Sequence, residues 1–258
     1  MTRKRLIAPT SQDLKRSAFR IYEKARRVAH WNPKTDIDFE RPTTISAERQ
    51  ELAWHLASQS VYAEQVGMMQ AARLLNEVDD IAIRYCLATA VSDEAKHSEV
   101  FTRYAMIRGG VVAPDSEFVN NLFEGLETIE DPFGRFIAHS MLEGLAADEF
   151  WILRAAFKGD VLEEIYRRVS EDEARHVAIG MDYMSTVLRD RAFEDHVHAL
   201  EQYSHIALDI AGMTNDQIFV WLGGLVDKHP DEVARWMLRR HRQRIDHLLK
   251  GINKEAST

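Results

Sequence analysis

Two copies of one short motif constrain this chain more than any other feature. The first copy, Asp-Glu-Ala-Lys-His, occupies residues 93–97, and the second, Asp-Glu-Ala-Arg-His, occupies residues 172–176. In each copy a glutamate and a histidine stand three residues apart. On a helix this spacing places both side chains on one face, about one turn apart, where they can converge on one metal ion. Carboxylate oxygen together with imidazole nitrogen is a donor mixture that non-haem iron accepts.

A matching glutamate precedes each motif. Glu64 stands 30 positions before Glu94, and Glu143 stands 30 positions before Glu173. Thirty residues is about the path up one long helix, through a turn and back to the same height. The second set is the first set displaced by 79 residues. Four carboxylates and two histidines should therefore meet at mid-height of a bundle, which is enough for two metal ions with positions left open for oxygen.

The aspartates that open the two motifs predict supporting contacts. On a helical wheel Asp93 lies close to His97, and Asp172 lies close to His176. Each aspartate can therefore point into the bundle and accept the free ring N–H of the histidine on the facing helix. That hydrogen bond would fix the tautomer of the histidine and raise its basicity as a ligand. His139, four residues before one of the upstream glutamates, is expected to support the site from the core, with an additional ligand as the alternative.

Helical periodicity dominates the chain, and alternating strand patterns are nearly absent. Four long helices are expected at about 46–76, 78–109, 132–159 and 160–188, with Ser46 and Asp160 as N-caps. Shorter helices are expected at about 12–29 and 116–127, with three more in 193–250 and a frayed tail after Gly251. The predicted fold class is all-α, a four-helix bundle with additional N- and C-terminal helices. We expect one domain over residues 1–258, with the core bundle at about 46–188.

Charge and cysteine content exclude several classes of function. The net charge of -8 argues against nucleic acid as the main partner, because phosphate binding needs a basic face. A single cysteine, Cys86, excludes an internal disulfide and any all-cysteine iron–sulfur or zinc site. The N-terminal apolar run is too short for a signal peptide, and no segment has the length and apolarity of a membrane span. A cytoplasmic location without membrane contact is the resulting expectation.

The sequence twice contains a glutamate followed by Asp-Glu-x-x-His. This pattern resembles that of the di-iron carboxylate proteins of the ferritin-like superfamily. It is most similar to the branch that contains the ribonucleotide reductase small subunit, the bacterial multicomponent monooxygenases and the di-iron N-oxygenases. The resemblance covers about residues 46–188. It implies a site for two iron ions, or for manganese/iron or dimanganese, that reacts with dioxygen. The metal ligands that it implies are Glu64, Glu94, His97, Glu143, Glu173 and His176.

The sequence departs from two patterns of that branch. In the radical-generating reductase subunit a tyrosine follows the first histidine by four residues, and here that position is Phe101. This difference disfavours a stored tyrosyl radical. The best-known N-oxygenases carry an additional histidine four residues before the last glutamate, and here that position is Val169.

A comparison of the two repeats also suggests where a substrate could lie. One turn beyond the motif histidines stand Phe101 and Gly180, and one turn beyond the upstream glutamates stand Met68 and Ala147. The second repeat is therefore small where the first is bulky. This pattern predicts a pocket on the side of Gly180 and Ala147, walled by Phe101 and Met68, although plain packing of small residues between helices explains it nearly as well.

The function that these features favour is an oxygen-dependent oxidoreductase acting on a small organic molecule. Hydroxylation, N-oxygenation, desaturation and oxidative cleavage all remain open as the reaction. An external electron donor, a reductase or a ferredoxin, is expected because the chain has no nucleotide-binding glycine motif. The alternatives are a ferroxidase or iron-handling protein and a radical-generating subunit similar to that of ribonucleotide reductase. The oligomeric state stays open, with a homodimer as one option.

Overall fold

The computed structural model describes residues 6–28, 30–189 and 193–255. Within these ranges the chain is helical and has no β-strand, in agreement with the predicted fold class. The elements are η1 (Asp13–Lys15), α1 (Ser17–Val28), α2 (Ala47–Glu77), α3 (Ile81–Arg108), α4 (Ser116–Glu127), α5 (Pro132–Ala156), α6 (Val161–Arg189), α7 (Phe193–Ile210), α8 (Asp216–Leu225) and α9 (Pro230–Glu255).

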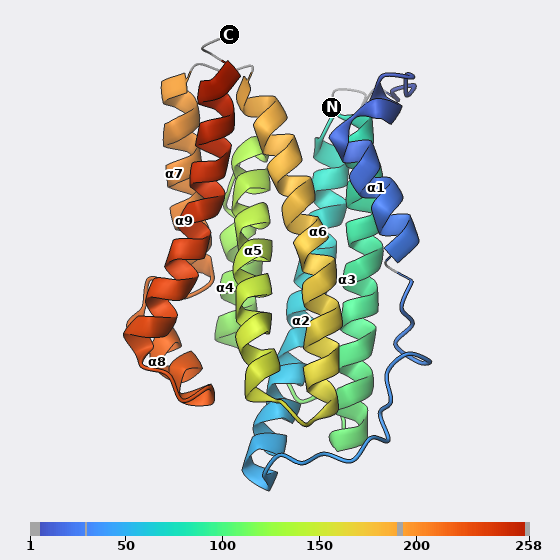
Figure 1. Cartoon of the computed structure of the whole chain (residues 1–258), viewed down its shortest axis with the longest axis vertical. Helices are drawn as coiled ribbons and strands as arrows, with labels where there is room; N and C mark the ends of the chain where they lie inside the picture. Colours follow the sequence, from blue (N-terminus) through green and yellow to red (C-terminus); the bar gives the residue numbers. More distant parts are fainter. Residues whose placement is uncertain (1–5, 29, 190–192, 256–258) are drawn as a thin grey trace.

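Four long helices, α2, α3, α5 and α6, form the central bundle (Figure 1). Helix α2 packs along α3, and α5 packs along α6. The pairs meet through contacts of α3 with α6 and of α2 with α5. Helix α4 carries the chain back along the bundle, so that α3 and α5 run in the same direction (Figure 1). Both 30-residue steps of the sequence therefore lie within antiparallel helix pairs.

Side-chain caps fix where the bundle helices begin. The Ser46 hydroxyl accepts a hydrogen bond from the Arg49 backbone N–H, which confirms Ser46 as the N-cap of α2. Asp80 accepts from two backbone N–H groups at the start of α3. Asp131 does the same for α5, with a proline in the first turn. Asp160 accepts from Leu162 N–H at 2.9 Å at the start of α6, as predicted.

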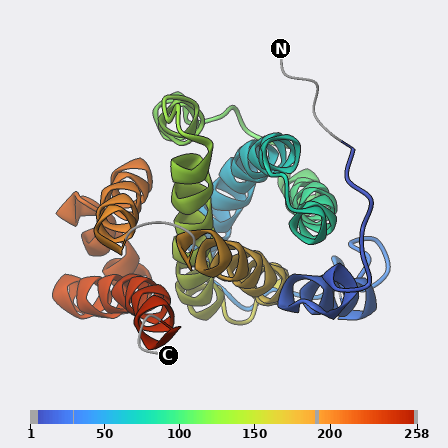
Figure 2. The ribbon, with the colours of Figure 1, turned by 90° about the horizontal axis from the view of Figure 1, so that it is seen from above.

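The shorter helices cover the outside of the bundle. Helix α1 packs on α3 and α6, whereas α7 and α9 pack on α5 at the opposite side (Figures 1 and 2).

Two predicted helix boundaries were wrong. The first helix does not start at residue 12, because Arg16 is extended (ψ 156°) and separates η1 from α1. The last helix does not end at 251, since the backbone stays helical to Glu255. Residue 29, the expected end of the first helix, lies outside the described residues.

Two apolar clusters fill the bundle above and below its middle. One gathers Val61, Phe101 and Val169 with neighbouring side chains, and the other gathers Leu74 and Ile179 with theirs. The candidate metal ligands fall between these clusters along every bundle helix. In the described part of the chain, no helix is both long enough and apolar enough to cross a membrane.

Candidate metal centre

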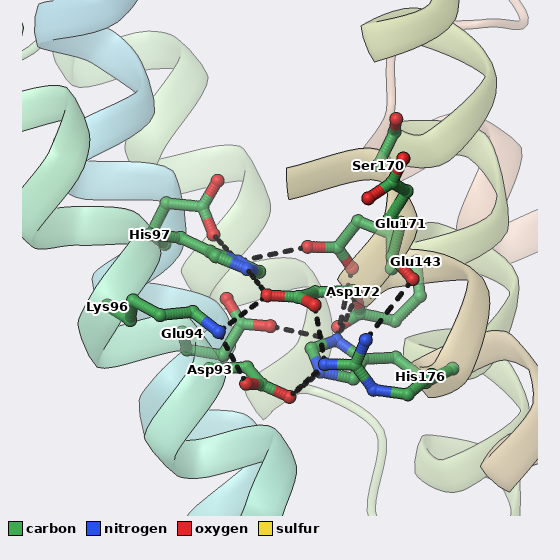
Figure 3. A network of polar contacts seen from close by, with 12 residues as sticks. Asp93, Glu94, Lys96, His97, Glu143, Ser170, Glu171, Asp172 and His176 are labelled. Carbon is green, nitrogen blue, oxygen red and sulfur yellow. Dashed lines mark hydrogen bonds and ion pairs between the residues drawn. The ribbon is translucent and has the colours of Figure 1, made fainter. Parts of the chain in front are cut away.

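The six residues singled out by the sequence lie together near the middle of the four bundle helices. Figure 3 labels four of them: Glu94, His97, Glu143 and His176. They form two groups, in each of which all candidate ligand atoms lie within 4.8 Å of one another. Glu94 and Glu173 belong to both groups, so the two sites would share two carboxylates. The first group is Glu64, Glu94, His97 and Glu173, and the second is Glu94, Glu143, Glu173 and His176.

The two rings of His97 and His176 present the same atom to the carboxylates. His97 Nδ1 lies 3.2 Å from Glu64 Oε2 and 3.2 Å from Glu173 Oε1. His176 Nδ1 lies 3.1 Å from Glu94 Oε1 and 3.1 Å from Glu173 Oε2. Nδ1 is therefore the nitrogen that could bind a metal in both rings, which leaves Nε2 free to donate a hydrogen bond.

The Nε2 atoms meet the motif aspartates across the bundle. His97 Nε2 lies 3.1 Å from Asp172 Oδ2, and His176 Nε2 lies 3.4 Å from Asp93 Oδ2. Each contact joins α3 to α6, as the helical wheel suggested. Burial acts to raise the pKa of Asp172, but the hydrogen bond and charge of His97 hold it well below the usual range. Such a carboxylate fixes the tautomer and the orientation of the ring.

Two cations complete this arrangement: Lys96, which is largely buried and is labelled in Figure 3, and Arg175, which is buried. Lys96 Nζ lies 2.9 Å from Asp93 Oδ1 and 2.7 Å from Asp172 Oδ2. Arg175 Nη2 lies 3.0 Å from Asp93 Oδ2 and 2.6 Å from Asp172 Oδ1. The sequence interpretation missed both cations, although they occupy the same place in the two motifs. A basic residue directly before the histidine in both motifs was the sequence feature that could have revealed them.

Trp31 covers the histidine end of the centre from outside the bundle. It lies in the connector between α1 and α2, and its Nε1 donates to Asp172 Oδ2 at 2.9 Å. Its ring stacks on His97 with the centroids 6.3 Å apart, and Lys96 Nζ lies 4.7 Å from the ring centroid. This segment, which lies between two predicted helices, was assigned no role from the sequence. An extended segment has no helical period that reveals which side chain points inward.

The carboxylates repel one another unless protons or cations lie between them. Burial, with repulsion from Glu94, raises the pKa of Glu64 well above its ordinary value. Burial, with repulsion from Glu173, raises the pKa of Glu143 to about 8. Burial, with repulsion from Glu173 and Glu143, also raises the pKa of Glu94. Buried like charges are costly, and divalent cations between the carboxylates would remove both this cost and the repulsion. Four carboxylates and two imidazoles therefore fit a pair of transition-metal ions.

Gly67 packs directly against a shared carboxylate. A Cβ atom at this position would lie 2.7 Å from Glu94 Oε2, so any side chain would displace that oxygen. We predict that Gly67→Ala lowers metal affinity about tenfold, the effect expected when a ligand loses its position. A chelator-competition titration measures this effect. Gly224→Ala on α8 is the matched control, because a Cβ there meets nothing within 4 Å. Equal affinity in both variants would contradict the assignment of Glu94.

A cavity of about 480 Å³ adjoins the six residues. Glu64, Glu94, Glu143 and Glu173 form part of its wall, and the remainder comes from α2, α4, α5, α6, α7, α8 and the turn after α7. Most of the wall is apolar, with Leu142 and Trp221 among the larger side chains. His139 also lines it, 3.2 Å from Glu143 Oε1 through Nε2, but it belongs to neither ligand group.

The cavity is not the pocket predicted from the two repeats. Gly180, Ala147, Phe101 and Met68 are all absent from its wall. A Cβ at Gly180 would overlap the Ser140 side chain of α5, so this glycine allows α5 and α6 to approach closely. Phe101 is fully buried in the apolar cluster below the centre. Gly180 borders a void of about 10 Å³ beside Glu143 and His176, and a substrate pocket on the side of Gly180 and Ala147 stays a prediction.

Solved structures with the same fold exist, although no protein-family model and no curated protein matches the sequence. An R2-like ligand-binding oxidase with aerobically reconstituted Mn/Fe cofactor superposes with a TM-score of 0.73 at 20% identity, covering 96% of this chain and 98% of that chain. A point mutant of an R2-like ligand-binding oxidase with anaerobically reconstituted Mn/Fe cofactor gives 0.73 at 21% identity, covering 93% and 94%. The ferritin-like fold predicted from the sequence is confirmed.

Proposed function

We propose that this chain, which has the fold of the R2-like ligand-binding oxidases, is an oxygen-activating oxidoreductase with two metal ions and a small organic substrate. The observation that carries the proposal is the pair of buried ligand groups that share Glu94 and Glu173 beside a cavity. The related structures were solved with manganese and iron, so an iron pair and a manganese/iron pair are the two forms to test.

In the proposed centre one ion would be held by Glu64 and His97 and the other by Glu143 and His176. The carboxylates common to both groups would bridge the ions. When reduced, such a metal pair supplies the electrons and the Lewis acidity that activate dioxygen. The shared carboxylates, Glu94 and Glu173, lie on α3 and α6, so the packing of these two helices would hold them in position.

The chain's own contribution is to orient the ligands and to limit access of water. Asp93 and Asp172 hold the Nε2 protons of the histidines, which leaves each Nδ1 atom unprotonated toward its metal. Lys96 and Arg175 balance the charge of the aspartates, so no aspartate needs to be neutralised by a metal. Apolar side chains fill the bundle above and below the metal ligands. A substrate and dioxygen would therefore approach the ligands through the cavity.

We further propose that electrons arrive from a separate reductase or ferredoxin. Oxidation of an organic substrate by dioxygen usually needs two electrons in addition to those of the substrate. The sequence has one cysteine and no nucleotide-binding glycine motif, so it carries no redox group of its own beyond the proposed metals. A substrate that itself supplies the electrons would remove this requirement.

The test is to load the protein anaerobically with iron(II) and to mix it with dioxygen. We expect one burst of oxidation that consumes the two bound irons, after which added iron(II) is not oxidised faster than in buffer. Stopped-flow absorbance and a ferrous-iron assay follow the reaction. Continued oxidation of many irons per chain would instead identify a ferroxidase. No oxidation of bound iron would contradict the proposal altogether.

A further inference from the structure

The cavity beside the candidate metal ligands carries an unbalanced set of charges. Among the residues that line it, seven are carboxylates and none is a lysine or an arginine. Four of the seven are the candidate ligands, which the metals would neutralise. A ligand head bound away from the metals would therefore meet carboxylates and no lysine or arginine.

Three carboxylates in this wall are not candidate ligands, and two of them, Asp115 and Asp209, are exposed. The third, Glu149, is partly buried. It lies on the inner face of α5, in line with Leu142, Ala146 and Leu153, which are all apolar. Within the described chain Glu149 makes no hydrogen bond or ion pair, and burial alone raises its pKa to about 7. A carboxylate in an apolar stripe without a partner costs stability, which suggests that its partner is a ligand.

A second polar group in the wall has no well-formed hydrogen bond in the described part of the chain. Tyr166 is fully buried and lines the cavity, and its hydroxyl has only the side chain of Ser60 as a weak hydrogen-bonding neighbour. After burial, the charge of Glu149 is the main cause that raises the pKa of Tyr166, which places both polar groups in the same part of the cavity. A ligand head with several N–H donors could satisfy the carboxylate and the hydroxyl together.

The position of Glu149 also indicates how a ligand would be oriented. Glu149 follows the candidate ligand Glu143 by six residues on one helix, a rise of roughly 9 Å along its axis. Between them the wall is formed by Ala146 and Leu145. A head group held at Glu149 would thus leave room for several methylene groups before the chain reaches the metal centre.

We propose that the cavity binds a primary aliphatic amine, with its ammonium group at Glu149 and its alkyl chain directed along α5 toward the candidate metal ligands. Glu149 supplies the charge and the apolar stripe contacts the methylene groups. The inference rests on the proposed function, since it names the substrate class that the metal centre would oxidise.

The test is calorimetric binding to the metal-loaded protein under anaerobic conditions, with n-octylamine and 1-octanol as probes. We expect the amine to bind roughly tenfold or more tightly than the alcohol, as a charge-assisted hydrogen bond predicts. Glu149→Gln should remove most of the advantage of the amine and leave the alcohol unchanged. Because no turnover is involved, a failure of oxygen activation does not affect this result.

Asp209→Asn is the matched control, since Asp209 also lines the cavity but is exposed. We expect this variant to bind the amine as the wild type does. Four results would overturn the proposal: no probe binds, the alcohol binds as tightly as the amine, Glu149→Gln retains amine binding, or Asp209→Asn alone loses it.

A melting experiment shows that Glu149→Gln remains folded. The raised pKa means that the folded state disfavours the ionised Glu149 carboxylate, so this group lowers stability progressively as pH rises from the unfolded value toward about 7. The glutamine variant should therefore melt at or above the wild-type temperature at pH 8, with the difference shrinking at pH 5. A lower melting temperature at pH 8 would mean that Glu149 has a stabilising partner.

Discussion

Replacing Glu94 with alanine should abolish binding of both metal ions. Glu94 belongs to both ligand groups, so its loss removes a donor from each ion and the bridge between them. Metal analysis after anaerobic loading and desalting should find well under one ion per chain. The metal-free variant should not unfold more easily, because burial and repulsion from Glu173 raise the pKa of Glu94 and make this carboxylate unfavourable in the empty cluster.

The matched variant is Glu143→Ala. Glu143 belongs to one group only, so one ion should remain bound through the other group. The two variants remove the same side chain from the same cluster and differ in whether the carboxylate is shared. Equal losses in both, or retention of two ions in Glu94→Ala, would show that the ligand groups are assigned wrongly.

Replacing Asp172 with alanine should both destabilise the protein and weaken metal binding. Asp172 is almost fully buried and accepts hydrogen bonds from Trp31 and His97 while pairing with Lys96 and Arg175. Its removal leaves Lys96 and Arg175 with Asp93 as their remaining partner. It also leaves the buried N–H groups of Trp31 and His97 without an acceptor, so the total cost is about 3 kcal/mol or more. For a chain of this size the melting temperature should fall by roughly 6–12 °C. Metal affinity should fall roughly 10- to 100-fold, because His97 loses the group that orients it.

Glu171→Ala is the control for this prediction. Glu171 precedes Asp172 on α6, but its side chain is exposed and pairs only with Arg167. Exposed ion pairs of this kind contribute at most about 1 kcal/mol. Melting curves and chelator competition should therefore give near wild-type values for the control. A wild-type melting temperature in Asp172→Ala would show that the hydrogen bonds and ion pairs of this carboxylate do not stabilise the protein.

The bundle and its six converging residues could be predicted because their geometry is periodic. A Glu-x-x-His spacing lies on one helix face whatever surrounds it, and a 30-residue step returns to the same height for any short turn. The facing contacts of Asp93 and Asp172 followed from the same helical wheel. These features depend on local geometry and on pairing of neighbouring helices, which are the levels of structure that a single sequence specifies most directly.

The cavity could not be predicted because much of its wall comes from helices that carry neither of the two repeated motifs. Helices α4, α7 and α8 supply much of the lining, and where they pack is a matter of tertiary contacts. The pocket expected beside Gly180 is not part of this cavity, and Ser140 of the neighbouring helix packs closely against that glycine. Glu149 did carry a signal, a carboxylate in an otherwise apolar stripe, which could have been recognised from the sequence of α5.

Anaerobic titration with iron(II), followed by metal counting, tests the central claim most directly. Two buried ligand groups with two shared carboxylates predict saturation at two ions per chain, and no more than one in the Glu143→Ala variant. Reaction of the loaded protein with dioxygen should then oxidise both ions together. Saturation at two ions that react with dioxygen would support a bridged, oxygen-activating pair. Saturation at one ion or none would contradict it.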